Sequence, residues 1–235
     1  MIEKLLKIFA SYNIGLTQEQ AKLFEKYFKL LISWNEKFNL TAITDEDEVI
    51  VKHFLDSVLL AEFIPKNASV VDVGSGAGFP GIPLKILRDD INLVMIDSLQ
   101  KRVGFLEEMI KELNLNNSSA IHTRGEDFAS PNQNREKFDV CVSRAVARLA
   151  TLSEVCLPLV KVGGLFVPSK SAECKEEVEE AKKAISILGG EFQKTIEIHI
   201  VENGSQRSFP IIKKIKPTQA KYPRGKNLPK TNPLI

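Results

Sequence analysis

The spacing of hydrophobic residues along the chain changes near residue 66. Before it, apolar residues recur at the three- and four-residue spacing that is typical of helices. The stretch 17–20, Thr-Gln-Glu-Gln, predicts a capping box at the start of one helix. A second apolar stripe predicts a continuous helix over about 46–63, which Pro65 ends. We therefore expect residues 1–66 to form an N-terminal helical cap.

From Ser69 onward, short apolar runs alternate with stretches of helical period. Strands are predicted over 69–73, 92–96, 118–122, 138–142, 163–168, 191–201 and 208–215, and helices over 80–88, 99–113, 148–160 and 172–188. Such alternation favours an α/β, Rossmann-like domain over residues 67–216, with a mostly parallel seven-stranded sheet and an antiparallel C-terminal strand. The proline-rich remainder, 217–235, is predicted to be an extended, weakly structured tail.

Composition and charge narrow the class of protein. The chain has 43% hydrophobic and 26% charged residues, which is ordinary for a soluble globular protein. Its net charge is only +2, but residues 203–235 hold eight Lys or Arg and no Asp or Glu. Contact with nucleic acid would therefore involve this basic end. Three scattered cysteines and three histidines lack metal-site spacing, and no apolar run is long enough to span a bilayer. We therefore expect a cytoplasmic, monomeric protein without a metal.

The chemistry is concentrated where the first predicted strand meets a glycine-rich turn, over residues 70–81. A strand that breaks into glycines ahead of a helix presents unpaired N–H groups, which suit a phosphate or a carboxylate of a cofactor. The glycines at 74, 76, 78 and 81 do not follow the dinucleotide spacing counted from Gly74. The turn, with Gly74, Ser75 and Gly76, is thus at least as well suited to the methionine end of S-adenosylmethionine.

Two carboxylates flank this turn. Asp72 can accept hydrogen bonds from the loop amides or reach a cofactor ammonium through water. Asp97 ends the second strand, where it can accept both hydroxyls of an adenosine ribose, although it could equally cap the next helix. The pair favours S-adenosylmethionine. A nicotinamide oxidoreductase would instead need pyrophosphate spacing from the first glycine of the turn, whereas here that spacing is met from Gly76 and not from Gly74. Its Tyr-x-x-x-Lys has one match, Tyr222 with Lys226, which lies in the basic C-terminal end.

Several colinear motifs together resemble the glucose-inhibited division protein B family, RsmG. They are Trp34-Asn35, Phe38-Asn39-Leu40-Thr41, His53-Phe54-Leu55-Asp56-Ser57, the turn of residues 72–81, Asp97-Ser98, Lys101-Arg102, Ser143-Arg144-Ala145-Val146-Ala147 and Tyr222-Pro223-Arg224. Members are class I S-adenosylmethionine-dependent methyltransferases that modify N7 of a guanine in small-subunit ribosomal RNA. The resemblance implies this fold, this cofactor and this RNA, or its ribonucleoprotein particle, as partner.

The resemblance also implies positions for the cofactor. Gly74 and Phe79 would flank the methionine portion, Gly125 and Glu126 would contact the adenine side, and Arg144 would lie at the mouth near the reactive methyl. Relatives usually have Ala where this chain has Gly125. Relatives also continue the Tyr-Pro-Arg motif with Gly-Thr-Pro, which this chain lacks at 225–229.

Transfer to N7 of guanine needs no base, because N7 has a lone pair and no proton. Consistent with this, the chain lacks the Asn/Asp-Pro-Pro-Tyr stretch of amine methyltransferases, and Cys141 lies inside a predicted strand, where it is more typical of a core. Arg144 follows that strand and could donate to guanine O6 or hold a phosphate. Its alternative is a surface ion pair.

Further candidates lie at the two ends of the chain. Asn39, His53 and Asp56 would join the catalytic site only if the helical cap packs beside the strand ends; on sequence alone, His53 fits a core residue and Asp56 a structural anchor equally well. Trp34 fits the core, with base stacking as its alternative. The predicted RNA contacts are Lys213, Lys214, Lys221, Arg224 and Lys226. A different function is an RNA-binding assembly factor that keeps the cofactor site without turnover.

Overall fold

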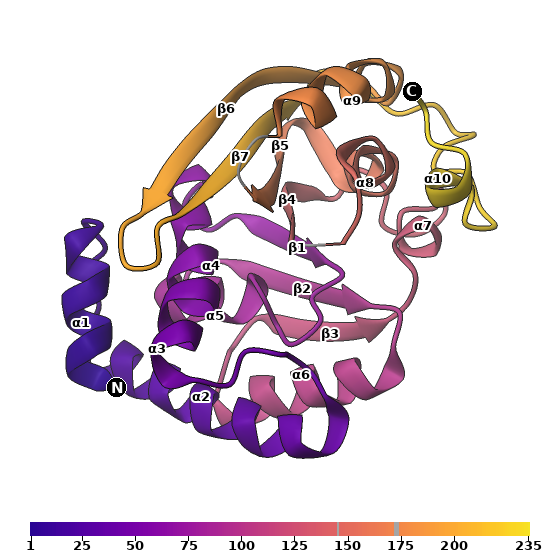
Figure 1. Ribbon diagram of the computed structural model, residues 1–235. Coiled ribbons are helices and arrows are strands. Elements are labelled where there is room, and N and C mark those ends of the chain that lie inside the picture. Colours follow the sequence, from indigo (N-terminus) through magenta and orange to yellow (C-terminus); the bar gives the residue numbers. More distant parts are fainter. Residues whose placement is uncertain (145, 172–173) are drawn as a thin grey trace.

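The computed structural model describes residues 1–144, 146–171 and 174–235. Within these ranges the chain forms one sheet of seven strands in the order β3-β2-β1-β4-β5-β7-β6, with helices on both faces (Figure 1). The strands are β1 (Ser69–Val73), β2 (Asn92–Asp97), β3 (Ser118–His122), β4 (Phe138–Arg144), β5 (Val160–Ser171), β6 (Gly190–Ile200) and β7 (Ser205–Lys214). Only β7, among these, runs antiparallel to its neighbours. The predicted fold class is confirmed.

The helices of the described ranges vary widely in length. They are α1 (Ile2–Ser11), α2 (Gln18–Phe38), α3 (Glu46–Val49), α4 (Asp56–Val58), α5 (Gly81–Leu87), α6 (Gln100–Glu112), α7 (Gly125–Phe128), α8 (Leu149–Cys156), α9 (Lys175–Ile187) and α10 (Leu228–Thr231). The helix predicted over 172–188 begins with two residues, 172 and 173, that lie outside the described residues. The short α7 and α10 were not predicted, because four-residue helices show no period.

The predicted capping box begins α2 and also joins this helix to the sheet layer. Gln20 N donates to Thr17 Oγ1 at 3.1 Å, and Thr17 N donates to Gln20 Oε1 at 3.0 Å. The Gln20 amide donates further, to the carbonyl oxygens of Ile86 and Leu87 at the end of α5. One side chain therefore closes the start of α2 and the end of α5.

The helix predicted over 46–63 has the predicted bounds, but it is not a regular α-helix. The segment is instead α3, a π-helical turn (Ile50–Leu55), α4 and a 3-10 turn (Leu59–Phe63). From Val49 to Leu60 every residue except Lys52 is buried, so protein surrounds this segment on nearly all sides. A one-sided amphipathic pattern therefore does not describe it, and π-helical turns of this kind are frequent at functional sites.

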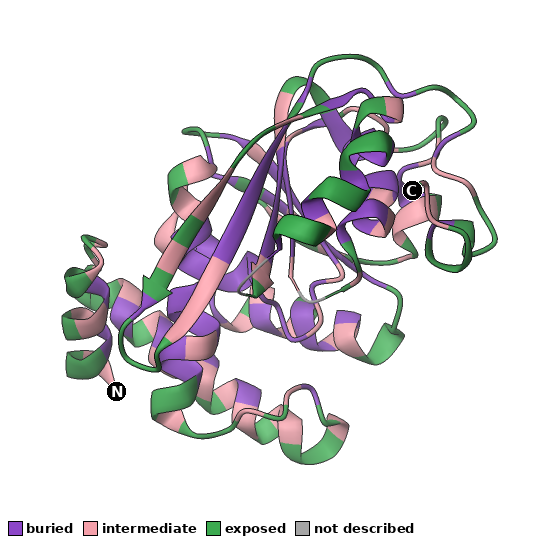
Figure 2. Ribbon diagram, turned by 45° about the horizontal axis from the view of Figure 1, so that its top comes forward, coloured by how far each residue is buried: buried purple, intermediate pink, exposed green. Residues whose placement is uncertain are grey.

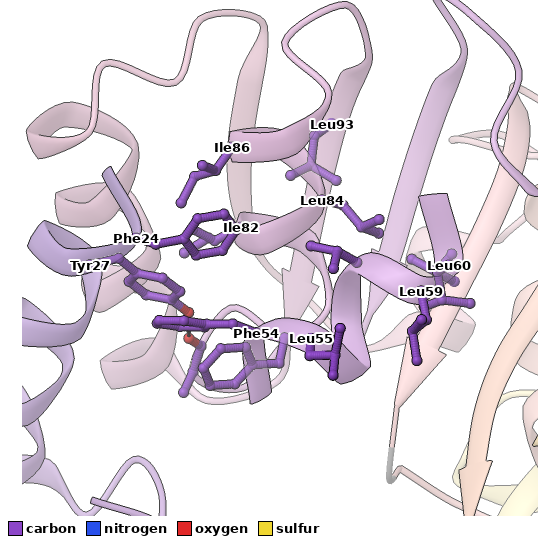
Figure 3. Packing of buried hydrophobic residues seen from close by; sticks show 14 of the residues in the cluster. Phe24, Tyr27, Phe54, Leu55, Leu59, Leu60, Ile82, Leu84, Ile86 and Leu93 are labelled. Carbon is purple, nitrogen blue, oxygen red and sulfur yellow. Dashed lines mark hydrogen bonds between the residues drawn. The ribbon is translucent and has the colours of Figure 1, made fainter. Parts of the chain in front are cut away.

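Apolar side chains form one buried cluster on each face of the sheet, and Figure 2 marks the buried residues along the strands and the helices around them. On one face the N-terminal helices pack on α5, and Phe24, Tyr27 and Phe54 meet Ile82 and Leu84 (Figure 3). On the other face a second cluster lies beneath α8 and α9. The helices of residues 1–63 thus pack on each other and on α5 and α6, the helices that cover this face of the sheet. This packing brings the end of α2 and the π-helical turn beside the strand ends.

The C-terminal segment is ordered, so the predicted weakly structured tail is wrong. Arg135 donates to the Thr218 carbonyl at 3.1 Å and to the Tyr222 carbonyl, and Tyr222 is buried. The Arg224 guanidinium pairs with the fully buried Glu154 of α8 at 2.6 Å. Proline and lysine content alone gave no sign of these anchors, because the partners lie 70 or more residues earlier.

Cysteines and acidic residues give no indication of a metal centre in the part of the chain that is described. Cys141, Cys156 and Cys174 are buried free thiols. Among described residues, no three His, Cys, Asp or Glu side chains gather closely enough to hold an ion. None of the described helices is both long and apolar enough to cross a membrane.

Candidate active site

Two adjoining hollows lie at the carboxyl ends of β1, β2 and β4. The first encloses about 420 Å³ and the second about 360 Å³, and both are lined by Gly74, Asp97, Ser98 and Val146. The strand order reverses between β1 and β4, which is where open α/β sheets bind ligands. The first hollow extends toward α7 and α8, and the second toward the π-helical turn and Arg144. Together they form a trough suited to an elongated cofactor.

The glycine turn does not present the free amides that its sequence suggests. The donor N–H groups already bonded are those of Gly74, Ser75, Gly76, Gly78, Phe79 and Gly81, and their acceptors are Ile96 O, Asp97 Oδ2, Ser75 O and Asp72 Oδ2. These bonds are 2.8–3.1 Å long. A pyrophosphate cradle needs such amides to be available. The expectation of unpaired N–H groups is therefore wrong for these six amides, and the turn is better suited to a cofactor without phosphates.

Asp97 performs two structural tasks at the junction of the hollows. Its carboxylate is 3% exposed; Oδ2 accepts from Gly76 N at 2.9 Å and Oδ1 accepts from Leu99 N at 2.9 Å. The second bond holds the backbone just before α6, which is close to the alternative role of Asp97 as a helix cap. Because an ionised carboxylate accepts up to four hydrogen bonds, the same group remains able to bind ribose hydroxyls.

Asp72 lies beneath the turn and is completely buried. Its Oδ2 accepts from Gly81 N at 3.0 Å, as the sequence predicts, while Oδ1 has no partner among the described residues. Burial raises the pKa of this carboxyl to about 7. The unpaired oxygen lies beneath the turn and in neither hollow, so it could reach a cofactor ammonium only through a bridging water.

Two glycines give the trough its shape. Gly74 has φ of +75°, and a Cβ there would lie 2.6 Å from Val146 Cγ2. Any side chain at 74 would therefore collide with Val146 where the two hollows join. At Gly125 a Cβ would lie 2.3 Å from Val155 Cγ1 of α8. The glycine that replaces the alanine of relatives thus lets α7 pack closely on α8.

Arg144 leaves the end of β4 and reaches the π-helical turn. Its Nη1 donates to Asp56 Oδ2 at 2.8 Å and to the Lys52 carbonyl at 3.0 Å. Its Nη2 lies 3.0 Å from His53 Nδ1, and the guanidinium lies 4.9 Å from the centre of the Phe79 ring. Arg144 does form an ion pair, but the pair is largely buried and lines the second hollow. The adjoining motif residue Ala145 lies outside the described residues.

Asp56 is held from two sides, and the second partner was not foreseen. The carboxylate is 1% exposed, with Oδ1 bonded to Arg207 Nε at 2.7 Å and Oδ2 bonded to Arg144. Arg207 comes from β7, and it lies 151 positions from Asp56, which no local pattern can reveal. With both oxygens in ion pairs, Asp56 holds Arg144 in place.

His53 is both a buried residue and a wall of the second hollow, so the two sequence interpretations are compatible. Its ring stacks on Phe79 with centroids 4.3 Å apart. Because a guanidinium can only donate, Nδ1 must accept from Arg144, and the ring proton resides on Nε2. Nε2 lies 2.9 Å from Thr41 Oγ1. Burial, followed by the nearby Arg144 cation, lowers the pKa of His53 to about 3, so the ring is neutral at physiological pH.

Within the motif at 38–41, the structure favours Thr41 over the predicted Asn39. Asn39 ends α2 in the left-handed conformation (φ 48°) and is exposed, and it does not line the second hollow. Thr41 lines that hollow, and its Oγ1 also accepts from Ile43 N at 3.1 Å. Trp34 packs against Phe105 with ring centroids 5.5 Å apart, as expected for a core residue.

The predicted RNA contacts separate into two groups. Lys214 is fully buried and donates to the carbonyls of Leu157 and Leu188, so its selection as an RNA contact is wrong. Arg224 is engaged with Glu154. Strand alternation placed Lys214 inward and Lys213 outward, and the sequence count of charges could not separate them. Lys213, Lys221 and Lys226 are exposed.

The sheet order and the trough at its switch point are those of the fold that S-adenosylmethionine-dependent methyltransferases share. The structure resembles TYW2 of M. jannaschii in complex with AdoMet (TM-score 0.57, 18% identity, 69% of this chain and 76% of that chain). It also resembles a SAM-dependent methyltransferase from Aquifex aeolicus (TM-score 0.52, 18% identity, 71% and 93%). At these identities the likeness shows the fold alone.

Sequence relatives give the family. Residues 20–207 match the family model GidB, described as rRNA small subunit methyltransferase G. "Ribosomal RNA small subunit methyltransferase G" of Desulforamulus reducens is 49% identical over 94% of this chain and 93% of its own length. The same-named protein of Brevibacillus brevis is 47% identical over 99% of both. The chain belongs to this family, which confirms the resemblance, and S-adenosylmethionine is its cofactor.

Proposed function

We propose that the protein transfers a methyl group from S-adenosylmethionine to N7 of a specific guanosine in small-subunit ribosomal RNA. Family membership supports the rRNA substrate. The choice of N7 is supported by one observation: around the second hollow, each group that could remove a proton is already engaged. An acceptor atom that carries a lone pair and no proton needs no such group.

The engagement of these groups can be followed bond by bond. Both oxygens of Asp56 accept from arginines. His53 Nδ1 accepts from Arg144, and the carboxylate of Asp97 is bonded to two backbone amides. Among the described residues lining this hollow, Asp97 is the only one with a carboxylate. Methyl transfer to an exocyclic amine would require a proton to leave, and the site is poorly equipped to take it.

Hydrogen-bond donors, in contrast, are available. The guanidinium of Arg144 has five N–H groups, and three hydrogen bonds to protein use only part of this set. Thr41 Oγ1 accepts from both His53 and Ile43, so its own hydroxyl hydrogen remains for a group in the hollow. Guanine presents two acceptors on one edge, O6 and N7, whereas adenine presents a donor beside N7. The arrangement therefore favours guanine.

The bound cofactor supplies a methyl group on a positively charged sulfur. The chain's contribution is to hold the acceptor base in line with that methyl, because orientation is the main requirement of such a displacement. We assign Gly74 and Phe79 to the methionine end, Asp97 to the ribose, and Gly125 and Glu126 to the adenine end. Arg144, positioned by Asp56 and His53, meets the base.

The test uses cofactor labelled in its methyl group with small-subunit RNA, both free and as the ribonucleoprotein particle. We expect label in a nucleoside whose bond is cleaved under conditions specific for N7-methylguanosine. A transcript made with 7-deazaguanosine in place of guanosine should accept no label. Label in that transcript would contradict N7 as the acceptor. RNA binding without any transfer would favour the assembly factor.

A further inference from the structure

The C-terminal segment forms part of the wall of the first hollow. Asn227, Pro229 and Lys230 line it together with Gly125 and Glu126, the positions assigned to the adenine side. In the fold, α10 lies beside α7 and packs on α8 (Figure 1). Residues near the end of the chain therefore enclose the space that the adenosine half of the cofactor would occupy.

This wall is fixed on both sides rather than loosely attached. Before it, Arg224 donates through its backbone N and its Nε to Glu154 Oε1 at 2.9 and 2.8 Å. Within it, Thr151 Oγ1 donates to the Pro229 carbonyl at 2.9 Å, and after it Arg224 Nη2 donates to the Asn232 carbonyl at 2.7 Å. Glu154 is fully buried, so the ion pair anchors the segment to the interior of α8. A wall fixed in advance loses little entropy when a ligand binds.

The backbone conformation at residues 226 and 227 also determines the course of this segment. Lys226 and Asn227 have φ of 58° and 59°, a left-handed pair that reverses the chain before α10 begins. Asparagine tolerates this conformation better than most residues. Pro229 then restricts the backbone of the first turn of α10. The turn thus places Asn227 and, three residues later, Lys230 at the same hollow.

We propose that Asn227 and Lys230 bind the adenosine end of S-adenosylmethionine, so that this part of the C-terminal segment is a cofactor clamp. An adenine ring offers nitrogen acceptors around its edge, and an amide and an ammonium are suitable donors. Lys230 belongs to the basic C-terminal end, so a contact with the cofactor would withdraw its charge from RNA binding. The clamp depends on the cofactor alone and is independent of which RNA atom is methylated.

The clamp is tested by calorimetric titration of the full chain with S-adenosylhomocysteine and, separately, with 5′-methylthioadenosine, which lacks the amino-acid part. Asn227→Gly removes the amide and keeps a residue suited to positive φ, and Lys230→Ala removes the ammonium. Each should weaken both ligands about fivefold, the effect of losing one hydrogen bond. The double variant should weaken them further, and to the same extent for the two ligands.

The matched control is Lys226→Asn, which removes a charge from the same turn, suits positive φ and does not line the hollow. It should bind both ligands as the parent does. Thermal unfolding without ligand should show all variants folded. Unchanged binding by the double variant, or a loss confined to S-adenosylhomocysteine, would overturn the clamp. Because no RNA is present, neither outcome bears on the N7 proposal.

Discussion

The absence of a side chain at position 74 keeps the two hollows continuous. Gly74→Ala adds one carbon 2.6 Å from Val146 Cγ2, and Gly74→Asp adds a carboxylate that would also repel the carboxylate of the methionine moiety. We expect Gly74→Asp to abolish binding of S-adenosylhomocysteine in calorimetry. Gly204→Ala is the control, because Gly204 also has positive φ but open space around it. Both alanine variants carry the backbone strain of about 1–2 kcal/mol, and only Gly74→Ala should lose affinity. Equal affinities would refute the collision.

Thr41 gives a second residue-level prediction, concerning the base rather than the cofactor. Thr41→Val keeps the shape and removes the hydroxyl, while Thr41→Ser keeps the donor. Loss of one hydrogen bond to the base should lower kcat/KM for RNA about tenfold in the valine variant, and serine should restore most of it. The affinity for S-adenosylhomocysteine should not change in either. If serine is as impaired as valine, Thr41 serves packing alone.

Asp72 predicts a pH dependence of stability. Its folded pKa of about 7 lies above the unfolded value near 3.8, so the folded state binds more protons between these values. The free energy of unfolding should therefore fall as pH rises from about 4 to 7, by roughly 4 kcal/mol at most. Asp72→Asn stays neutral, so its stability relative to the parent should grow over this range in urea titrations. His53 has the opposite dependence but contributes equally to both proteins. Parallel curves would contradict the buried, protonated carboxyl.

The residues that the sequence could identify differ in a physical way from those that it could not. Asp72, Asp97 and Arg144 were recognisable because a charged residue at the end of an apolar strand is unusual, whereas His53 was selected through the family motif. Arg207 was missed because it looks like any polar residue of a strand, and its partner Asp56 is distant in sequence. Local spacing identifies single groups, but it does not identify which groups pair.

Among the elements, the contact between β4 and the π-helical turn carries the next prediction. Arg144→Ala should reduce the single-turnover rate of methyl transfer about 100-fold or more, because the base loses its orienting donor. Folding should suffer less, about 1–3 kcal/mol in urea unfolding, because Asp56 keeps Arg207 as partner. Arg148→Ala is the control: Arg148 is 67% exposed and pairs with Glu180 away from the trough. An Arg144 variant that fails to fold would show that the residue is structural.

The bounds of helices and strands could be predicted where a single sequence feature sets them. β1 and β3 have the predicted bounds, since short β-branched or apolar runs end at turn residues. The helical segment over 46–63 also has its predicted bounds, but its π-helical and 3-10 turns were not foreseen, because burial on all sides removes the polar face that defines a regular helical period. The order of α10 was also hidden, because Glu154, on α8, supplies its anchor.

Across the whole molecule, the lysines and arginines after residue 203 have two different roles. Lys214 and Arg224 bond to groups inside the fold, and Lys230 lines the cofactor hollow. A count of basic residues therefore overstates what this segment can offer to RNA. Truncation after Lys216 would remove the buried Tyr222 and one wall of the first hollow. Truncation therefore cannot separate RNA binding from cofactor binding.

Substitution of exposed lysines separates the two. Lys221 and Lys226 are exposed and do not line either hollow at the strand ends, so their replacement by glutamine should leave cofactor affinity intact. If both contact phosphates, the slope of log binding constant against log salt should fall by about 1.4–1.8 for small-subunit RNA. Lys175→Gln with Lys182→Gln removes the same charge from α9, whose neighbouring glutamates make it a poor surface for phosphates. An equal change of slope in the two double variants would show that only net charge matters, and no change in either would place the RNA on another face.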